Sequence, residues 1–131
     1  MEKLIELISK NQTLEYIGGC TTKDLENGEL KLELKFPEEY KNLLLEFGVI
    51  SFDSHEWFGL NVAGYLNVIE STLSERELNN KFPSDCFVLE NLGIDGILIL
   101  VDSNENVYEW NGDEKKVIAT SLLQYYLDCL N

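Results

Sequence analysis

The stretch FPEEYKNLLLEFG, residues 36–48, carries the clearest structural signal in the sequence, that of one amphipathic helix. Pro37 suits the first turn of a helix, where its missing N–H leaves no partner unsatisfied. Four side chains recur at helical spacing and predict one buried face: Tyr40, Leu43, Leu44 and Phe47. Gly48 then ends the helix as a C-cap. We therefore expect the rest of the chain to pack around a helix that is buried on one side.

The segment before this helix gives two conflicting signals. Leu30, Leu32 and Leu34 alternate with charged residues, which predicts a half-buried strand over residues 30–35. The sequence TTKD at residues 21–24, however, is typical of a helix that starts with a capping box. The pattern alone favours the strand, and it leaves open whether residues 30–35 end a helix or form a strand.

Three further helices are predicted from apolar periodicity, over residues 2–10, 67–79 and 120–130. Thr120 or Ser121 is expected to cap the last of them. The predicted inward side chains are Leu4, Ile5 and Ile8 in the first, Val68, Ile69, Leu73 and Leu78 in the second, and Leu122, Leu123, Tyr126, Leu127 and Leu130 in the third.

Strands are predicted at residues 49–52 and 57–62, joined by a polar turn of Asp53, Ser54, His55 and Glu56. A β-meander follows, with strands over residues 86–93, 97–101, 107–110 and 117–119, and a hairpin signal at Asp95-Gly96. Residues 97–101 are apolar throughout, as in a strand buried on both faces. The sequence thus predicts an α+β fold and a single domain over residues 1–131. Its mostly antiparallel meander sheet would pack with helices at the N-terminus, the middle and the C-terminus.

Charge and targeting signals restrict the classes of partner. The 24 acidic and 10 basic side chains give a net charge of −14, which disfavours direct binding to nucleic acid or to an anionic membrane and favours a basic partner. A negative surface that only keeps the protein soluble is the open alternative. The N-terminus has no signal-peptide pattern, the apolar runs are too short to span a membrane, and the three cysteines show no ligand spacing. We expect a cytoplasmic protein with reduced thiols.

Motif chemistry predicts no catalytic residue, no cofactor and no metal site. His55 is the only histidine, and no second histidine or suitably spaced cysteine accompanies it. Asp102 begins a segment that is similar to a calcium loop, but Val107 stands at the position that needs glycine, so a tight turn is expected. For Trp57 and Trp110 a core position is favoured over a binding hot spot, which remains the open alternative. An enzyme or a small-ligand receptor would require a concave pocket with convergent polar groups.

The sequence resembles the SUKH superfamily, the Smi/Knr-type domains, from about Thr22 to Leu130. The positions that carry the resemblance are Thr22, Leu25, Glu29, Leu32, Leu34, Phe36-Pro37, Tyr40, Leu43-Leu44 and Gly48, followed by Phe58-Gly59-Leu60 and the meander. The resemblance implies a helix over roughly residues 22–32, and we adopt that prediction over the strand. Phe47 stands where many relatives have an asparagine before the glycine.

The resemblance also implies a function. Bacterial members are commonly immunity proteins, which bind and neutralise a toxin domain, often a nuclease. The leading hypothesis is therefore an immunity protein, or antitoxin, that occludes a cognate basic nuclease domain. The alternative is an intracellular protein-protein interaction module with a regulatory role and no toxin partner. The family supplies no catalytic residues and no fixed interface, so exposure and charge alone suggest partner-binding residues on loops: Asp53, Glu56, Trp57, Asp95, Asp102 and Glu105.

Overall fold

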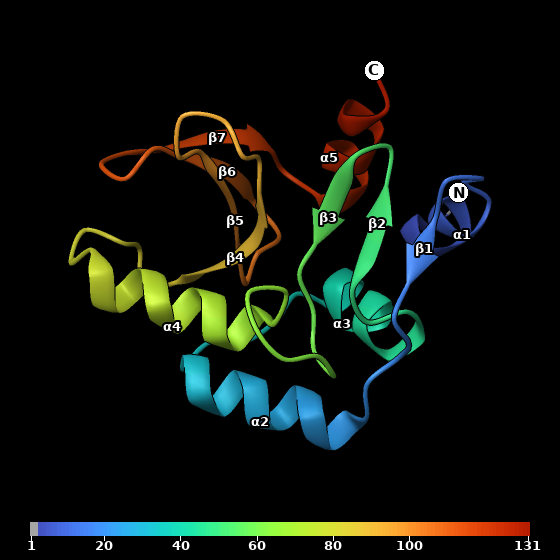
Figure 1. Cartoon of the computed structure of the whole chain (residues 1–131), viewed down its shortest axis with the longest axis horizontal. Coiled ribbons are helices and arrows are strands. Elements are labelled where there is room, and N and C mark those ends of the chain that lie inside the picture. The colour runs from blue at the N-terminus through green and yellow to red at the C-terminus, as the bar shows by residue number, and fades with distance from the viewer. Residues whose placement is uncertain (1–2) are drawn as a thin grey trace.

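The computed structural model describes residues 3–131 and confirms the α+β class, with helices and two antiparallel sheets in the described part (Figure 1). Glu2, which the predicted first helix includes, lies outside the described residues. The helices are α1 (Leu4–Ser9), α2 (Thr22–Leu32), α3 (Glu38–Glu46), α4 (Val68–Leu78) and α5 (Leu122–Cys129). The strands are β1 (Glu15–Tyr16), β2 (Ile50–Phe52), β3 (His55–Trp57), β4 (Cys86–Asn91), β5 (Leu98–Asp102), β6 (Val107–Trp110) and β7 (Lys115–Ala119).

Helix α3 forms as its sequence predicts. Pro37 is the N-cap residue, and the four residues predicted to face inward are buried. The hydroxyl of Tyr40 donates to the carbonyl of Phe58 at 2.6 Å, and its ring stacks on Phe87 with the centroids 4.7 Å apart. Gly48 follows the C-cap residue Phe47 with φ +75°, and its N–H donates to the carbonyl of Leu43. Helix α3 is therefore held both by its buried face and by a polar contact inside the core.

The strand interpretation of residues 30–35 is wrong, and the helix that the family resemblance implies is present as α2. Thr21 caps it: the N–H of Asp24 donates to the Thr21 hydroxyl, and the N–H of Thr21 donates to the Asp24 carboxylate. The periodicity misleads because Leu30, at 77% exposure, lies on the solvent side of the helix. The local capping signal thus outweighs the alternation of apolar residues.

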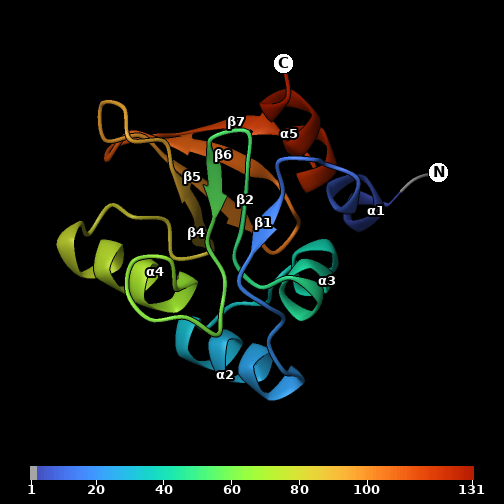
Figure 2. The same ribbon diagram turned by 45° about the vertical axis from the view of Figure 1, so that its right-hand side comes forward.

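A close packing contact explains the glycine in the middle of α2. A Cβ added to Gly28 would lie 3.3 Å from the ring of Phe36 and 3.4 Å from the Cδ1 of Ile69 in α4. Glycine in the middle of a helix costs about 1 kcal/mol relative to alanine, but at position 28 it allows neighbouring side chains to approach the helix closely. Helices α2 and α4 lie side by side in both views (Figures 1 and 2).

Three glycines lie where backbone segments meet. A Cβ on Gly19 would lie 2.0 Å from the carbonyl oxygen of Leu45, and one on Gly48 would lie 2.1 Å from that of Gly18. A Cβ on Gly59 would lie 2.9 Å from the carbonyl carbon of Gly48. We call Gly19, Gly48 and Gly59 the glycine joint. It brings the segment before α2, the end of α3 and the segment after β3 into backbone contact.

The first sheet has the strand order β1-β2-β3, and Figure 2 shows its strands between α4 on one flank and α1 and α3 on the other. The predicted polar turn is shorter than expected, because only Asp53 and Ser54 form it, both with positive φ, and His55 and Glu56 belong to β3. The predicted strand at 57–62 is wrong beyond Trp57. There the chain turns to the second sheet, as the N–H of Phe58 donates to the carbonyl of Leu89 at 2.7 Å.

The second sheet is the predicted meander, in the order β4-β5-β6-β7. All residues of β5 are buried, as expected for an interior strand, and Asp95 and Gly96 both have positive φ in the hairpin turn. Trp57 and Trp110 are core residues, as predicted. The three cysteines are free, with Cys20 and Cys86 buried and Cys129 half-buried.

Two helical faces differ from their predictions. In α4 the predicted inward residues Leu73 and Leu78 are exposed, whereas Thr72 is buried and its hydroxyl accepts from the N–H of Val88 at 3.0 Å. In α5, which Ser121 caps, the buried face consists of Leu122, Tyr125 and Tyr126, while Leu127 and Leu130 are exposed. In both helices a side chain with a hydroxyl occupies the inward position, because a polar partner is available there.

Candidate protein-binding surface

The outward face of the first sheet gathers carboxylates. Glu15 of β1 lies opposite Ser51 of β2, and Ser51 lies opposite Glu56 of β3, so the two glutamates flank Ser51 on the same face. Asp53 occupies the turn that joins β2 to β3. These three acidic residues, with Thr13, Ser54 and His55 among their neighbours, line a groove of about 570 Å³. We call Glu15, Asp53 and Glu56 the acidic groove.

Local contacts hold the turn of the acidic groove in place. The N–H of Asp53 donates to the hydroxyl of Thr13 at 3.0 Å, and one carboxylate oxygen of Asp53 lies 3.1 Å from the same hydroxyl. Both contacts join residues far apart in the sequence. The carboxylate therefore projects from a fixed turn rather than from a free loop tip.

An exposed tyrosine borders the acidic groove. Tyr65 is 64% exposed, and its hydroxyl donates to a carboxylate oxygen of Glu56 at 3.3 Å. The negative charge of Glu56 raises the pKa of Tyr65, so the hydroxyl stays protonated at neutral pH. Tyrosine is one of the residue types enriched at binding hot spots. Tyr65 thus adds an aromatic contact to a surface that is otherwise acidic.

The structure brings only two of the six suggested partner-binding residues, Asp53 and Glu56, into the acidic groove. Asp95 is exposed at the tip of the β4–β5 hairpin, and Glu105 is half-buried and accepts from the N–H of Leu122 at 2.8 Å. The expected exposure is wrong for Trp57, which is 1% exposed.

The expected exposure is also wrong for Asp102, which is 6% exposed. Its carboxylate accepts from the N–H groups of Asn104 and Asn106 and from the Tyr108 hydroxyl. The segment that is similar to a calcium loop is therefore a tight turn closed by this carboxylate, as predicted.

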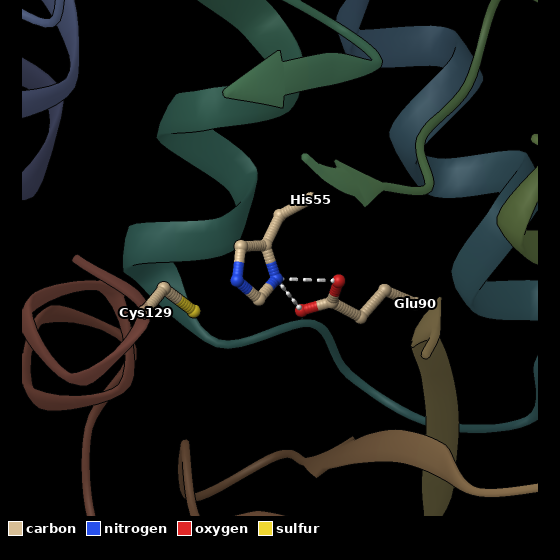
Figure 3. Close-up of side chains that lie close together, drawn as sticks. All are labelled: His55, Glu90 and Cys129. Carbon is tan, nitrogen blue, oxygen red and sulfur yellow. Dashed lines mark hydrogen bonds and ion pairs between the residues drawn. The ribbon is translucent and has the colours of Figure 1, made fainter. Parts of the chain in front are cut away.

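Behind the acidic groove lies a second polar cluster, which the sequence did not predict. His55 is half-buried in β3, and its Nδ1 lies 3.0 Å from Oε1 of Glu90 in β4 (Figure 3). Glu90 is 1% exposed, and its Oε2 accepts from Nε1 of Trp57 at 3.2 Å and from the hydroxyl of Tyr125. A β-bulge between Val88 and Glu90 shifts the register of β4 beside this side chain. Three donors thus surround one buried carboxylate.

Cys129 completes the cluster on the side of α5. Its sulfur, a nitrogen of His55 and an oxygen of Glu90 all lie within 4.8 Å of one another, and these are the atom types that could hold a metal ion. Burial, followed by the charge of Glu90, raises the pKa of Cys129 to about 12. The thiol is therefore protonated at neutral pH, which argues against a role as a catalytic nucleophile.

Sequence reasoning missed Glu15, Tyr65, Glu90 and Cys129. Glu90 had a usable signal, because it is the one charged residue within the otherwise apolar run CFVLE, in a strand that was predicted correctly. Buried charges need specific partners, so such a residue points to a polar cluster. Glu15 had no comparable signal, since a two-residue strand leaves no periodicity to detect.

A family model described as SMI1-KNR4 cell-wall (SUKH_5) matches residues 1–131. The chain belongs to the SUKH family. The resemblance seen in the sequence is thereby confirmed, and the match extends over the N-terminal segment that the resemblance did not include. No curated protein matches the chain. SUKH proteins are not a known enzyme family. Within residues 3–131 of this SUKH chain, no helix has the length and apolar character to cross a membrane.

Proposed function

We propose that this SUKH protein is an immunity protein that binds and neutralises a cognate toxin domain, a basic nuclease. The acidic groove is the observation that carries the proposal. Glu15 and Glu56 project from one face of the first sheet, Asp53 projects from the adjoining turn, and an exposed tyrosine lies at the border of the groove. The family resemblance supplies the toxin-binding role, and the net charge of −14 supplies the electrostatic match to a basic partner.

Occlusion of a nuclease suits such a surface. A site that holds nucleic acid presents basic side chains to the phosphates. A row of carboxylates can take the positions of these phosphates and contact the same basic side chains. Opposite fields also steer the two proteins together, which raises the association rate and makes it depend on salt. The acidic groove would therefore compete with the nucleic-acid substrate for the same basic residues.

The proposal is tested first by growth rescue. The full chain is co-expressed with the toxin domain encoded by the neighbouring gene, and binding of the purified pair is titrated at low and moderate salt. We expect restored growth and tight binding that weakens as salt increases. If the chain neither restores growth nor binds the toxin domain, the immunity role is contradicted. Binding to several partners with modest affinity would favour the regulatory interaction module instead.

The location of the interface is tested separately by charge reversal. Glu56→Lys should lower the association rate with the toxin domain by about three- to tenfold at low salt and flatten its salt dependence. Glu77→Lys is the matched control, because Glu77 is exposed in the last turn of α4 and its reversal changes the net charge by the same amount. Equal effects of the two variants would mean that total charge, and not the acidic groove, steers the encounter.

A further inference from the structure

The side chains in Figure 3 come from three elements, since His55 belongs to β3, Glu90 to β4 and Cys129 to α5. Together they offer an imidazole nitrogen, a carboxylate oxygen and a thiol sulfur, all within 4.8 Å of one another. Zinc takes these three donor types in proteins. We propose that His55, Glu90 and Cys129 form a binding site for zinc or a closely similar divalent cation.

The spacing of the three side chains requires little adjustment. In a tetrahedral zinc site, ligand atoms about 2.0–2.3 Å from the ion lie about 3.3–3.6 Å from one another. Nδ1 of His55 and Oε1 of Glu90 are already 3.0 Å apart. Atoms up to 4.8 Å apart would have to approach by about 1 Å, within reach of side-chain rotation. Three protein ligands would leave the fourth position open to water.

Outer hydrogen bonds fix the carboxylate before any ion binds. Trp57 Nε1 and the Tyr125 hydroxyl both donate to Oε2 of Glu90. The other carboxylate oxygen, Oε1, lies within hydrogen-bond distance of Nδ1 of His55. Ligating carboxylates are typically hydrogen-bonded in this way by a second layer of donors, which orients them and reduces the cost of ordering the site.

The electrostatics and the access route also suit a cation. Glu90 is almost fully buried. In the ion pairs of the described residues its partner is His55, whose imidazole does not carry a permanent positive charge. Asp53 and Asp128 add negative charge near Cys129. A depression of about 250 Å³, lined by His55, Tyr125, Asp128 and Cys129 among others, connects the cluster to solvent. A divalent ion could enter by this route, where it would neutralise the buried carboxylate and displace the proton of the Cys129 thiol to solvent.

The site is tested with Co²⁺ as a spectroscopic probe for zinc, on the full chain under reducing conditions after treatment with a chelator. We expect one equivalent of Co²⁺ to produce a thiolate-to-cobalt charge-transfer band that zinc abolishes. Cys129→Ser should remove this band, and His55→Gln, which removes a direct ligand, should weaken Co²⁺ binding by more than the roughly 10- to 100-fold that loss of an outer partner costs. Cys20→Ser is the matched control, because Cys20 is another free thiol, outside the cluster, and its variant should keep the band.

A second measurement needs no variant and therefore does not depend on how variants fold. Thermal unfolding of the unmodified, chelator-treated protein is followed with and without zinc. An ion that binds the folded chain and not the unfolded one should raise the midpoint of unfolding as its concentration increases. A charge-transfer band that is absent at millimolar Co²⁺ or persists in Cys129→Ser would overturn the proposal, and so would a midpoint that millimolar zinc leaves unchanged.

Discussion

His55 and Glu56 are neighbours in β3, yet they belong to opposite environments. His55 faces the buried carboxylate of Glu90, which has three donors around it, whereas Glu56 faces the acidic groove and the solvent. Successive side chains of a strand point to opposite faces, so one short strand serves both regions. The difference shows that in this acidic chain the surroundings of a carboxylate decide its role. The buried carboxylate of Glu90 accepts hydrogen bonds from several donors, whereas the exposed carboxylate of Glu56 remains available to a partner protein.

The largest expected effect is the loss of the buried carboxylate. Glu90→Ala leaves the donors of His55, Trp57 and Tyr125 without their acceptor, and we expect the free energy of unfolding to fall by at least about 3 kcal/mol. Urea denaturation measures this change. Glu56→Ala is the matched control in the acidic groove and should change stability by less than about 0.5 kcal/mol. Similar losses in both variants would remove the distinction between the two regions.

A single hydroxyl sharpens the comparison within α5. Tyr125→Phe removes the donor to Glu90 and should cost about 1.5–3 kcal/mol, because hydrogen bonds to charged groups are stronger than neutral ones. Tyr126→Phe removes a hydroxyl that accepts from the side-chain amide of Asn11 at 3.0 Å, and it should cost about 1 kcal/mol. Thermal unfolding of the two variants gives the difference directly. A larger loss of stability for Tyr126→Phe than for Tyr125→Phe would contradict the stronger hydrogen bond expected at the buried carboxylate of Glu90.

A smaller effect concerns pH and the second buried carboxylate. Burial alone would raise the pKa of Asp102, but hydrogen bonds from Tyr108, Asn106 and Asn104 outweigh it and lower the pKa below its ordinary value. Ionised Asp102 thus stabilises the fold above its unfolded pKa of about 3.9, and this contribution is lost as the pH falls through the lower folded pKa. The stability difference between the parent protein and Asp102→Asn should therefore shrink from about pH 5 to about pH 2. A difference that stays constant over that range would refute the assignment.

The smallest expected effect is in the acidic groove itself. Glu56→Gln should leave the free energy of unfolding within about 0.5 kcal/mol of the parent value while it slows association with the toxin domain. Glu77→Gln, at an exposed position of α4, should change neither quantity beyond the effect of one unit of net charge. Urea denaturation and stopped-flow binding separate the two readouts. A large stability loss in Glu56→Gln would place Glu56 among the residues that hold the fold.

Local signals predicted most of the fold. Helix α3, the interior strand β5 and the hairpin at Asp95-Gly96 follow from periodicity, composition and turn chemistry. In α2 the alternation of apolar residues suggested a strand, whereas the local capping box and the family resemblance indicated the helix that is present. The prediction failed where tertiary contacts decide, on the buried faces of α4 and α5, because Thr72 and Tyr125 look polar until their partners are known.

The candidate site was less predictable than the fold. Asp53 and Glu56 were found because they are close in sequence and acidic. Glu15 joins them only through the pairing of β1 with β2, and Tyr65 joins through a hydrogen bond across a loop. The buried cluster draws His55, Glu90 and Cys129 from distant segments, so no spacing rule could connect them.

The glycine joint has a consequence for recognition. At Gly19, Gly48 and Gly59 three backbone segments touch without intervening side chains, and the N–H groups of Gly18 and Cys20 donate to the carbonyls of Phe47 and Leu44. The first sheet therefore cannot tilt against α3 unless these contacts open together. A partner that docks on the acidic groove would meet a preorganised platform, and its binding would forfeit little conformational entropy on this side of the complex.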